Sequence, residues 1–424
     1  MSDSKFIGYQ CSLCAAQYNP DDVTYTCPKD DGNLDVILDF EGLRRKKIDE
    51  FILRNEASLW RYLPLLPVDD PGGKMTPFRA AGWTPVFSVN RLAKQLGLRN
   101  LWVKDESRNP SASFKDRASS VVIARAREIG AEVVVTASTG NAGAALAGMA
   151  AAIGQKTVIF APCTAPPAKI AQLLIYGAKV LLVDGSYDDA FDLTIQASHE
   201  FGWYCRNTGY NPFTAEGKKT AALEIWEWWE NLNPHNLERL RNINLSIFIP
   251  VGDGNIISGV HKGFKDLKSL DLLDTLPRIF GVQSEGSAAV ANAYFAATEK
   301  ITPVSAKTIA DSISVDLPRD GVRALRAATQ TGGTFIIVSD ADILAAIAEL
   351  GRVGIFAEPA GAAAFAGLVK AVQNGQIKPD DAALVLNTGS GLKDIKAAMQ
   401  AVHEAPVIEP TIKAVKAHIS DFKL

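Results

Sequence analysis

Short runs of apolar residues, many of them β-branched, recur along the chain, with segments of helical length between most of them. They predict strands at residues 101–104, 133–136, 157–160, 180–183, 245–251, 279–282, 335–338 and 383–386. Strands that alternate with helices favour a mostly parallel, doubly wound sheet, because a crossover between parallel strands usually passes through a helix. We therefore expect an α/β protein with two α/β layers and a cleft between them.

The composition excludes several classes of protein. The chain has 424 residues, of which 47% are hydrophobic and 21% charged, and its formal net charge is −3, as expected of a globular protein with a large core. We see no basic run suited to nucleic acid, no apolar stretch of transmembrane length and no signal-peptide pattern at the start. Five cysteines are too few for a disulfide framework. We expect a cytoplasmic protein that binds neither nucleic acid nor a membrane.

Residues 1–40 are predicted to form a small cap that resembles a zinc ribbon. Cys11-x-x-Cys14 is followed by Cys27-Pro-Lys-Asp30, so an aspartate stands where a ribbon would carry its fourth cysteine. One interpretation is a zinc site of three cysteines and one aspartate, since a carboxylate oxygen is an acceptable ligand. The other is a ribbon that has lost its metal and remains as a packed cap. The sequence alone slightly favours the second, and in both cases the cap is a structural appendage.

A lysine stands at a predicted helix N-terminus in the segment Asn-Pro-Ser-Ala-Ser-Phe-Lys-Asp-Arg, residues 109–117. The Asn-Pro pair predicts a turn, and Ser113 with Asp116 predicts a capping box for the helix that follows. Lys115 then falls in the first helical turn, where the helix dipole disfavours a cation and lowers the pKa of the amine. A neutral amine can condense with a carbonyl. Lys115 is therefore either a nucleophile or an ordinary solvated lysine.

Three glycine-rich loops follow predicted strands at residues 137–143, 250–255 and 387–394. The first can bind a carboxylate or phosphate with its backbone N–H groups, although small residues there could also serve only close packing. The second matches neither the dinucleotide fingerprint nor the P-loop and fits one phosphate monoester, so the carboxylate of Asp253 must point away from the anion. In the third, the hydroxyl of Thr388 could hydrogen-bond a ring nitrogen.

Ligands of open α/β folds bind beyond the carboxyl ends of strands, so these three loops can converge on one cleft. A lysine amine, a cradle for a single phosphate and a hydroxyl partner for a ring nitrogen together describe a site for pyridoxal phosphate. Asn141 could in addition hydrogen-bond the phenolic oxygen of the cofactor. The sequence therefore predicts a pyridoxal-phosphate enzyme.

These motifs resemble the threonine synthase branch of the fold-type II pyridoxal-phosphate enzymes, over a span from about Cys11 to Asp394. The resemblance implies a tryptophan synthase β-like fold, with two doubly wound parallel-sheet domains and a cofactor cleft between them. It implies a cap at residues 1–40 and a catalytic region at 41–424, in which a smaller α/β subdomain at about 118–212 is inserted. A homodimer and a small amino-acid substrate are further expectations.

The resemblance also implies roles for individual residues. Lys115 would be the Schiff-base lysine and the acid/base of the reaction. The implied cofactor-binding residues are Phe114, Lys115, Asn141, Val251, Gly252, Asp253, Gly254, Asn255 and Thr388. The implied substrate-binding residues are Ser138, Thr139, Gly140 and Asn141. The reaction implied is the conversion of O-phospho-L-homoserine and water to L-threonine and phosphate.

One departure from the family pattern leaves the leaving group open. Several threonine synthases place an arginine for the substrate phosphate roughly where this chain has Thr214. Lys218, Lys219, Arg117 or Lys104 could compensate, or could be surface charges. The alternative is therefore an ammonia-lyase for threonine, serine or a diamino acid, or a β-replacement synthase of the same fold. A third hypothesis is a catalytically silent pyridoxal-phosphate binder.

Overall fold

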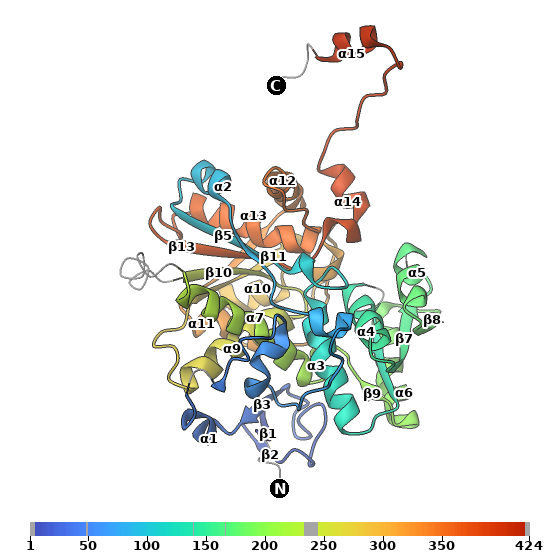
Figure 1. Ribbon diagram of the computed structural model, residues 1–424, viewed down its shortest axis with the longest axis vertical. Helices are drawn as coiled ribbons and strands as arrows, with labels where there is room; N and C mark the ends of the chain where they lie inside the picture. Colours follow the sequence, from blue (N-terminus) through green and yellow to red (C-terminus); the bar gives the residue numbers. More distant parts are fainter. Residues whose placement is uncertain (1–4, 48–49, 139, 166, 233–244, 420–424) are drawn as a thin grey trace.

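The computed structural model describes residues 5–47, 50–138, 140–165, 167–232 and 245–419. Figure 1 shows a large sheet in the upper half, a smaller sheet to its right and a cap at the bottom, next to the N-terminus. All eight predicted strands form. The predicted α/β class is confirmed.

The larger sheet has the strand order β12-β11-β10-β13-β5-β4. Its members are β4 (Val86–Ser88), β5 (Asn100–Asp105), β10 (Leu245–Pro250), β11 (Arg278–Ser284), β12 (Phe335–Val338) and β13 (Ala382–Asn387). Only the edge strand β4 is antiparallel to its neighbour. Every residue of β10 and β13 is buried, because helices cover both faces of a sheet of this kind.

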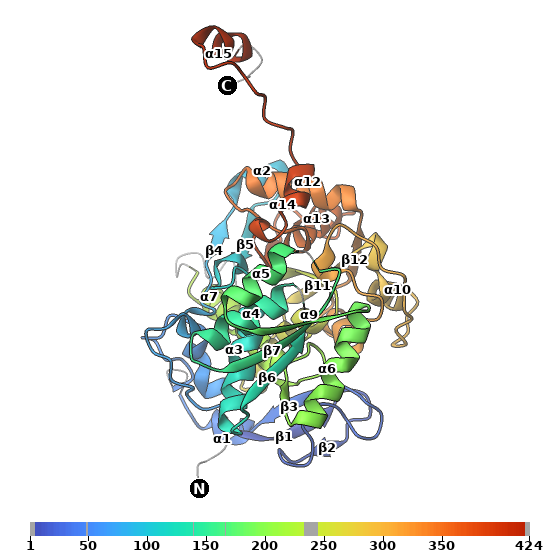
Figure 2. The same ribbon diagram turned by 90° about the vertical axis from the view of Figure 1, so that its right-hand side faces the viewer.

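The smaller sheet is parallel throughout and has the order β8-β7-β6-β9. Its strands are β6 (Val133–Ala137), β7 (Lys156–Pro162), β8 (Lys179–Val183) and β9 (Tyr204–Cys205). Figure 2 faces this sheet, with α4 and α5 on one side of it and α6 on the other. The sheet falls inside the expected subdomain at about 118–212, and the division of the chain into domains stays a prediction.

The helices connect these strands in order. They are α1 (Phe40–Arg44), α2 (Asn90–Gln95), α3 (Lys115–Glu128), α4 (Asn141–Ala151), α5 (Pro167–Ile175), α6 (Tyr187–Phe201), α7 (Phe213–Glu230), α9 (Asn255–Ser269), α10 (Ala289–Phe295), α11 (Gly321–Thr329), α12 (Asp340–Gly351), α13 (Pro359–Gln373), α14 (Ile395–Gln400) and α15 (Ile412–Ile419). The short 3-10 turns are η2 (Leu59–Leu65), η3 (Pro77–Ala80), η4 (Glu106–Arg108), η5 (Glu285–Ser287), η6 (Asp311–Ile313) and η7 (Gly391–Lys393). Within the described ranges, no helix has the length and apolar character that crossing a membrane requires.

Helices α3, α7 and α9 cross so closely that glycine is needed at the contacts. A Cβ atom on Gly217 would lie 2.2 Å from the carbonyl oxygen of Arg117, and one on Gly259 would lie 2.6 Å from the Cβ of Lys218. Both distances are far shorter than a van der Waals contact, so a larger residue would push the helices apart. The crossing holds Lys218 of α7 near the first turns of α3 and α9.

The cap is an antiparallel sheet of three strands in the order β2-β1-β3. The strands are β1 (Phe6–Cys11), β2 (Gln17–Tyr18) and β3 (Leu34–Leu38). The cap packs on the body through Phe6, whose ring meets that of Phe213 edge to face, with 5.7 Å between centroids. At the opposite end, α15 projects away from the body in both ribbon views and has no buried residue.

Candidate active site

Three neighbouring parallel strands end at the same edge of the larger sheet. β13 lies between β10 and β5, and these strands lead into Thr388, the loop at residues 251–254 and the Lys115 segment. They meet at a cavity, here called the Lys115 cavity, that is lined in part by Lys115, Gly252, Asp253, Gly254, Asn255 and Thr388. Val251 and Phe114 are buried and are not among the described lining residues. The structure thus brings most of the expected cofactor residues together, and their roles stay predictions.

The segment before Lys115 is an irregular turn that pairs with the Thr388 loop at one residue, Ser113. The N–H of Phe114 donates to the carbonyl oxygen of Thr388 at 2.8 Å, and Ser113 forms a β-bridge with Gly389. The predicted capping box is therefore wrong, since the Ser113 hydroxyl has no hydrogen-bond partner among the described residues. Asp116 instead accepts from the N–H of Ser111 at 2.6 Å. Pairing between distant segments replaces local capping here.

Lys115 begins α3, as the sequence predicts. Burial lowers the pKa of its amine below the usual value for lysine, and the positive charge of Arg206 lowers it further. The carboxylates of Glu358 and Asp253 oppose this shift. The direction agrees with the sequence argument, but the main cause is burial, a tertiary effect. A neutral amine is favoured at this position.

The loop between β10 and α9 leaves room only for glycine at two places. A Cβ atom on Gly254, whose φ is +88°, would lie 2.6 Å from the carbonyl oxygen of Asp320. A Cβ atom on Gly252 would lie 2.8 Å from the Cα of Ile313. α9 begins at Asn255 directly after this loop, so its unpaired N–H groups face the end of the loop. The arrangement suits one phosphate.

Asp253 lines the Lys115 cavity, yet its carboxylate accepts from the backbone N–H of Arg319 at 3.4 Å. Burial raises the pKa of this carboxyl above its usual value. Burial therefore favours the uncharged form, which reduces the repulsion between Asp253 and an anion in the loop. The sequence argument required the carboxylate to avoid the anion, and the Arg319 contact provides a partner for it.

The loop before α4 borders a second, larger cavity of about 420 Å³, which also includes Lys115. Ser138, Gly140 and Asn141 line this cavity, whereas Thr139 lies outside the described residues. Its volume is within the usual range for small-molecule sites. These residues follow a strand of the smaller sheet. The two cavities share Lys115, and their lining residues therefore come from both sheets.

Glu358 lines a cavity, one of the two roles that its place at a strand–helix junction predicts, the other being a helix cap. It precedes α13 without a capping hydrogen bond from its side chain, and it lines the Lys115 cavity. The side-chain amide of Asn141 donates to its two carboxylate oxygens at 3.0 and 2.9 Å. Burial raises the pKa of Glu358, while Asn141 and Lys115 favour its charged form. A polar residue at a strand–helix junction was the only sequence signal.

The cations named as candidates for a substrate phosphate have different partners in the structure. Lys219 pairs with Glu216 and Asp266, and Lys104 pairs with Glu224. Arg117, the third candidate, also pairs with Glu224, as described below.

Lys218 differs from these three residues. Among the described residues, it has no carboxylate partner, and its Nζ donates to the side-chain oxygen of Asn255. It is fully buried and lines the Lys115 cavity. Burial, with the nearby Lys115, holds the pKa of Lys218 well below its usual value.

Arg206 is a second buried cation that has no carboxylate partner among the described residues. No sequence pattern indicates it. Its Nη1 donates to the hydroxyl oxygen of Thr208 at 2.7 Å, and its Nη2 has no partner in the same part of the chain. Thr208 lines both cavities. Because its oxygen accepts from Arg206, the Thr208 hydroxyl can donate its proton into the cavity. Burial lowers the pKa of Arg206 to about 10.

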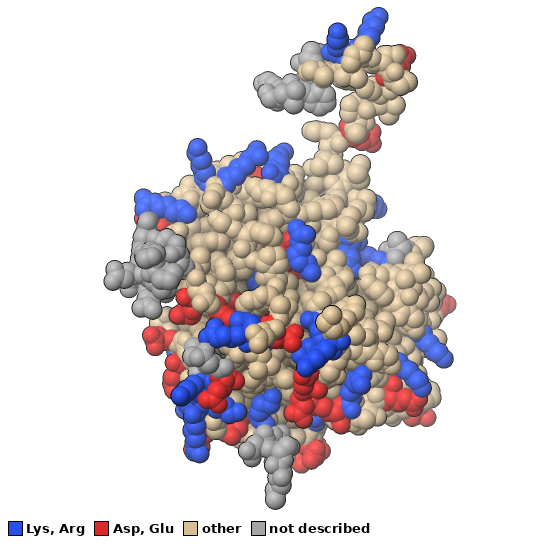
Figure 3. Space-filling model, in the orientation of Figure 1, with Lys and Arg blue, Asp and Glu red and all other residues tan. Residues whose placement is uncertain are grey.

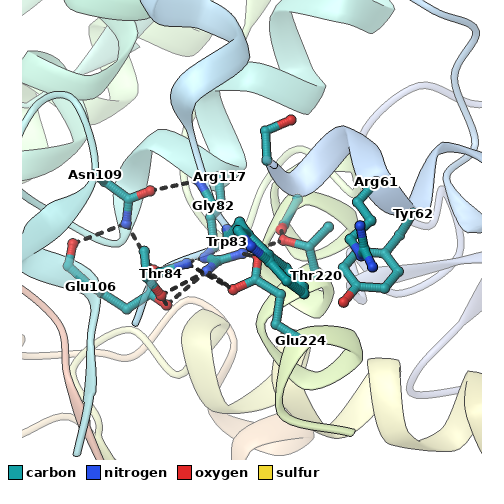
Figure 4. A network of polar contacts seen from close by, with 12 residues as sticks. Arg61, Tyr62, Gly82, Trp83, Thr84, Glu106, Asn109, Arg117, Thr220 and Glu224 are labelled. Carbon is teal, nitrogen blue, oxygen red and sulfur yellow. Dashed lines mark hydrogen bonds and ion pairs between the residues drawn. The ribbon is translucent and has the colours of Figure 1, made fainter. Parts of the chain in front are cut away.

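Arg117, two residues after Lys115, is the centre of a buried polar network (Figure 4). Its guanidinium group donates to both carboxylate oxygens of Glu106, at 2.7 and 2.8 Å, and to Glu224 at 2.7 Å. Lys104 donates to Glu224 as well, at 2.7 Å. The network ties α3 to η4 and α7 and so fixes the direction in which Lys115 enters the cavity.

Comparison with known proteins identifies the family. The family model described as pyridoxal-phosphate dependent enzyme matches residues 78–389. A threonine synthase of Methanocaldococcus jannaschii is 38% identical over 96% of this chain and 98% of the relative. That of Methanosarcina acetivorans is 38% identical over 96% and 97%, and that of Mycobacterium tuberculosis H37Rv 34% identical over 82% and 91%.

Solved structures support the same fold. Threonine deaminase isoform 2 from Solanum lycopersicum superimposes with a TM-score of 0.62 at 24% identity, over 75% of this chain and 83% of that one. Maize serine racemase gives a TM-score of 0.61 at 25% identity, over 73% and 88%. The fold, the match of residues 78–389 and the near full-length similarity agree. This chain therefore belongs to the pyridoxal-phosphate-dependent enzymes and, within them, to the threonine synthase family.

Proposed function

We propose that this enzyme converts O-phospho-L-homoserine and water to L-threonine and phosphate. One observation carries the proposal beyond family membership: Lys218 and Arg206 are buried beside the Lys115 cavity without a carboxylate partner among the described residues. Buried cations are costly unless an anion compensates them. The cofactor and this substrate would each bring a phosphate, which is the kind of anion that such a site requires.

The residues of the cavity fit pyridoxal phosphate. The amine of Lys115, the glycine cradle at Gly252 and Gly254 and the hydroxyl-bearing Thr388 border the same space. Cβ atoms at the two glycines would clash with backbone atoms or a packed side chain, so the loop keeps its backbone accessible. Lys115 would hold the cofactor, Thr388 would face its ring nitrogen, and Asn141 would meet its phenolic oxygen.

When bound, the cofactor supplies a carbonyl that condenses with amines and a ring that stabilises negative charge at the substrate's α-carbon. Lys115, with its lowered pKa, would then remove and return protons at the substrate carbons. The N–H groups at the start of α4, with Ser138 and Gly140, would hold the substrate carboxylate. The Thr208 hydroxyl would donate a hydrogen bond to the substrate phosphate while it accepts one from the charged Arg206.

The substrate assignment is tested with purified enzyme and four candidate substrates. O-phospho-L-homoserine should give equal amounts of phosphate and threonine, whereas L-threonine, L-serine and 2,3-diaminopropionate should give little ammonia. The motivation for testing ammonia is Thr214, which is buried and donates to the carbonyl oxygen of Asn211 at 2.7 Å. Ammonia formation with no phosphate release would show that the enzyme is a lyase of the alternative class. Cofactor binding without any turnover would favour a silent binder.

Lys218→Met should raise the KM for O-phospho-L-homoserine roughly 10- to 100-fold, because a hydrogen bond to a charged group contributes about 1.5–3 kcal/mol. Lys218→Arg keeps the charge and should recover most of the affinity. The dissociation constant of the cofactor is measured in parallel by absorbance titration. An unchanged KM with weaker cofactor binding would mean that Lys218 serves the phosphate of the cofactor instead.

We also propose that the enzyme acts in the cytoplasm as a homodimer without nucleic acid. Acidic and basic side chains are intermixed over the lower half of the face in Figure 3, which is unlike a nucleic-acid surface. The projecting α15 exposes Ile412 and Ile419, which a partner chain could cover. Light scattering should give twice the 45.5 kDa mass of one chain, and a monomer mass would contradict the dimer.

A further inference from the structure

Four potential metal ligands converge in the cap. Cys11, Cys14, Cys27 and Asp30 place one ligand atom each within 4.8 Å of one another. The Sγ atoms of Cys14 and Cys27 are 3.7 Å apart, and Cys11 Sγ lies 3.3 Å from Asp30 Oδ1. Tetrahedral zinc with ordinary bond lengths separates two sulfurs by roughly 3.8 Å and a sulfur from an oxygen by roughly 3.5 Å. The cysteines are free thiols, so no disulfide explains their approach.

The two halves of the cluster contain matching turns. In the first, the N–H of Ala15 donates to the carbonyl oxygen of Cys11, and in the second the N–H of Asp31 donates to that of Cys27. Ala15 and Asp31 both have positive φ, 59° and 54°. Two tight turns of equal geometry, each with two ligands, are the arrangement of a zinc ribbon. Asp30 occupies the place of the fourth cysteine.

Neighbouring groups are arranged around the ligand atoms. The N–H of Leu13 donates to Cys11 Sγ at 3.3 Å, and the N–H of Gly32 donates to Asp30 Oδ1 at 2.9 Å. A Cβ atom on Gly32 would lie 2.6 Å from Cys11 Sγ, so a larger residue would displace the ligands. Donors of this kind orient metal ligands and favour their charged forms.

The cap also contacts the wall of the active site. The side-chain amide of Asn33 donates to the carbonyl oxygens of Gly209 and Arg319. The hydroxyl of Tyr25 accepts from the N–H of Cys205 at 2.8 Å, and its ring stacks on that of Tyr210 with 4.5 Å between centroids. Segment 205–210 therefore lies against the cap, and Thr208 within it lines both cavities.

From this convergence we propose that Cys11, Cys14, Cys27 and Asp30 bind one Zn²⁺ ion, which fixes the cap against segment 205–210. Binding releases the thiol protons and closes the two turns on one another. The ion is structural, since all four positions of a tetrahedral site are occupied by protein ligands. It acts on the reaction only through the position of the Thr208 segment.

Metal analysis of the full-length enzyme, purified without chelator, tests the site. About one zinc per chain is expected, as in other closed four-ligand sites. Cys14→Ser should reduce the zinc content at least tenfold, whereas Cys163→Ser, which changes an exposed cysteine outside the cluster, should not. Asp30→Cys completes a site of four cysteines and should bind zinc more tightly, a gain that misfolding cannot produce. Iron in place of zinc, or equal metal content in wild type and Cys14→Ser, would overturn the proposal.

Two further measurements are independent of the proposed reaction. Cobalt added to the chelator-treated enzyme should give the absorbance of a tetrahedral thiolate site. A spectrum without this absorbance would overturn the proposed metal site. Hydrogen exchange without substrate should show weaker protection at residues 205–210 after zinc removal, with β12 unchanged. Equal protection of 205–210 with and without zinc would overturn the link to the active-site wall. Neither result depends on the identity of the amino-acid substrate.

Discussion

Replacing Lys115 with alanine should abolish the absorbance of the lysine-bound cofactor and reduce turnover by about 1,000-fold or more, because the variant loses both the covalent attachment and the proton-transferring group. Lys115 lies at the start of α3 and borders both cavities, and its lowered pKa favours the reactive neutral amine. The measurements are the visible spectrum and the initial rate with O-phospho-L-homoserine.

Lys94→Ala is the matched control, since Lys94 is an exposed lysine on another helix. It should leave both the spectrum and the rate unchanged. A primary amine added to Lys115→Ala should restore part of the rate if proton transfer is the missing function. A Lys115→Ala variant that keeps the cofactor band would show that another group holds the cofactor.

Arg117→Met should lower the free energy of unfolding by about 3–5 kcal/mol, because it leaves two buried carboxylates without their main cation. Those carboxylates are Glu106 and Glu224, which are both inaccessible to solvent or nearly so. The charge of Lys104 compensates Glu224 only in part. Denaturant unfolding of the cofactor-free enzyme measures the loss.

Arg99→Met provides the comparison, because Arg99 pairs with Asp380 at 2.6 Å but both side chains are more than half exposed. Removing such a surface pair should cost no more than about 1 kcal/mol. Adding Glu106→Gln to Arg117→Met should recover part of the stability, since one unpaired charge disappears. Equal losses for Arg117→Met and Arg99→Met would mean that the network does not stabilise the fold.

The layers of this fold could be predicted from the sequence because its parallel strands are buried on both faces. Runs such as residues 245–250 are apolar at nearly every position, and their short length with flanking turn residues favours strands over helices. β9 could not be predicted as an element, since two residues form no pattern. The antiparallel edge strand β4 has no buried residue, but its place directly after Gly82-Trp-Thr-Pro85, a segment that leads into a strand, could be predicted.

The site could be predicted only where chemistry follows local sequence. The glycines at 252 and 254 indicate a loop that needs an open backbone, and Lys115 follows a turn signal. The capping role assigned to Ser113 was wrong because residues distant in the chain, Thr388 and Gly389, hold that segment instead. Local rules cannot include such partners.

The buried charges illustrate the same limit. Lys218 and Lys219 are adjacent in sequence, yet on a helix they point about 100° apart. Lys219 meets Glu216 and Asp266, whereas Lys218 meets the side-chain oxygen of Asn255. Arg206 carries no sequence signal because its environment is created by the packing of the two sheets. Whether a cation is paired depends on tertiary structure.

The division of the site between two sheets has a thermodynamic consequence. The phosphate cradle, Thr388 and the Lys115 segment all follow strands of the larger sheet, while Ser138 to Asn141 follow β6 of the smaller one. The proposed cofactor contacts reach the second group only through Asn141, whereas the substrate carboxylate would be held by that group, so an amino acid restricts the relative motion of the two sheets more than the cofactor does. Substrate binding therefore carries a larger entropic cost than cofactor binding. The entropy of binding measured by calorimetry should therefore be less favourable for the amino acid than for the cofactor.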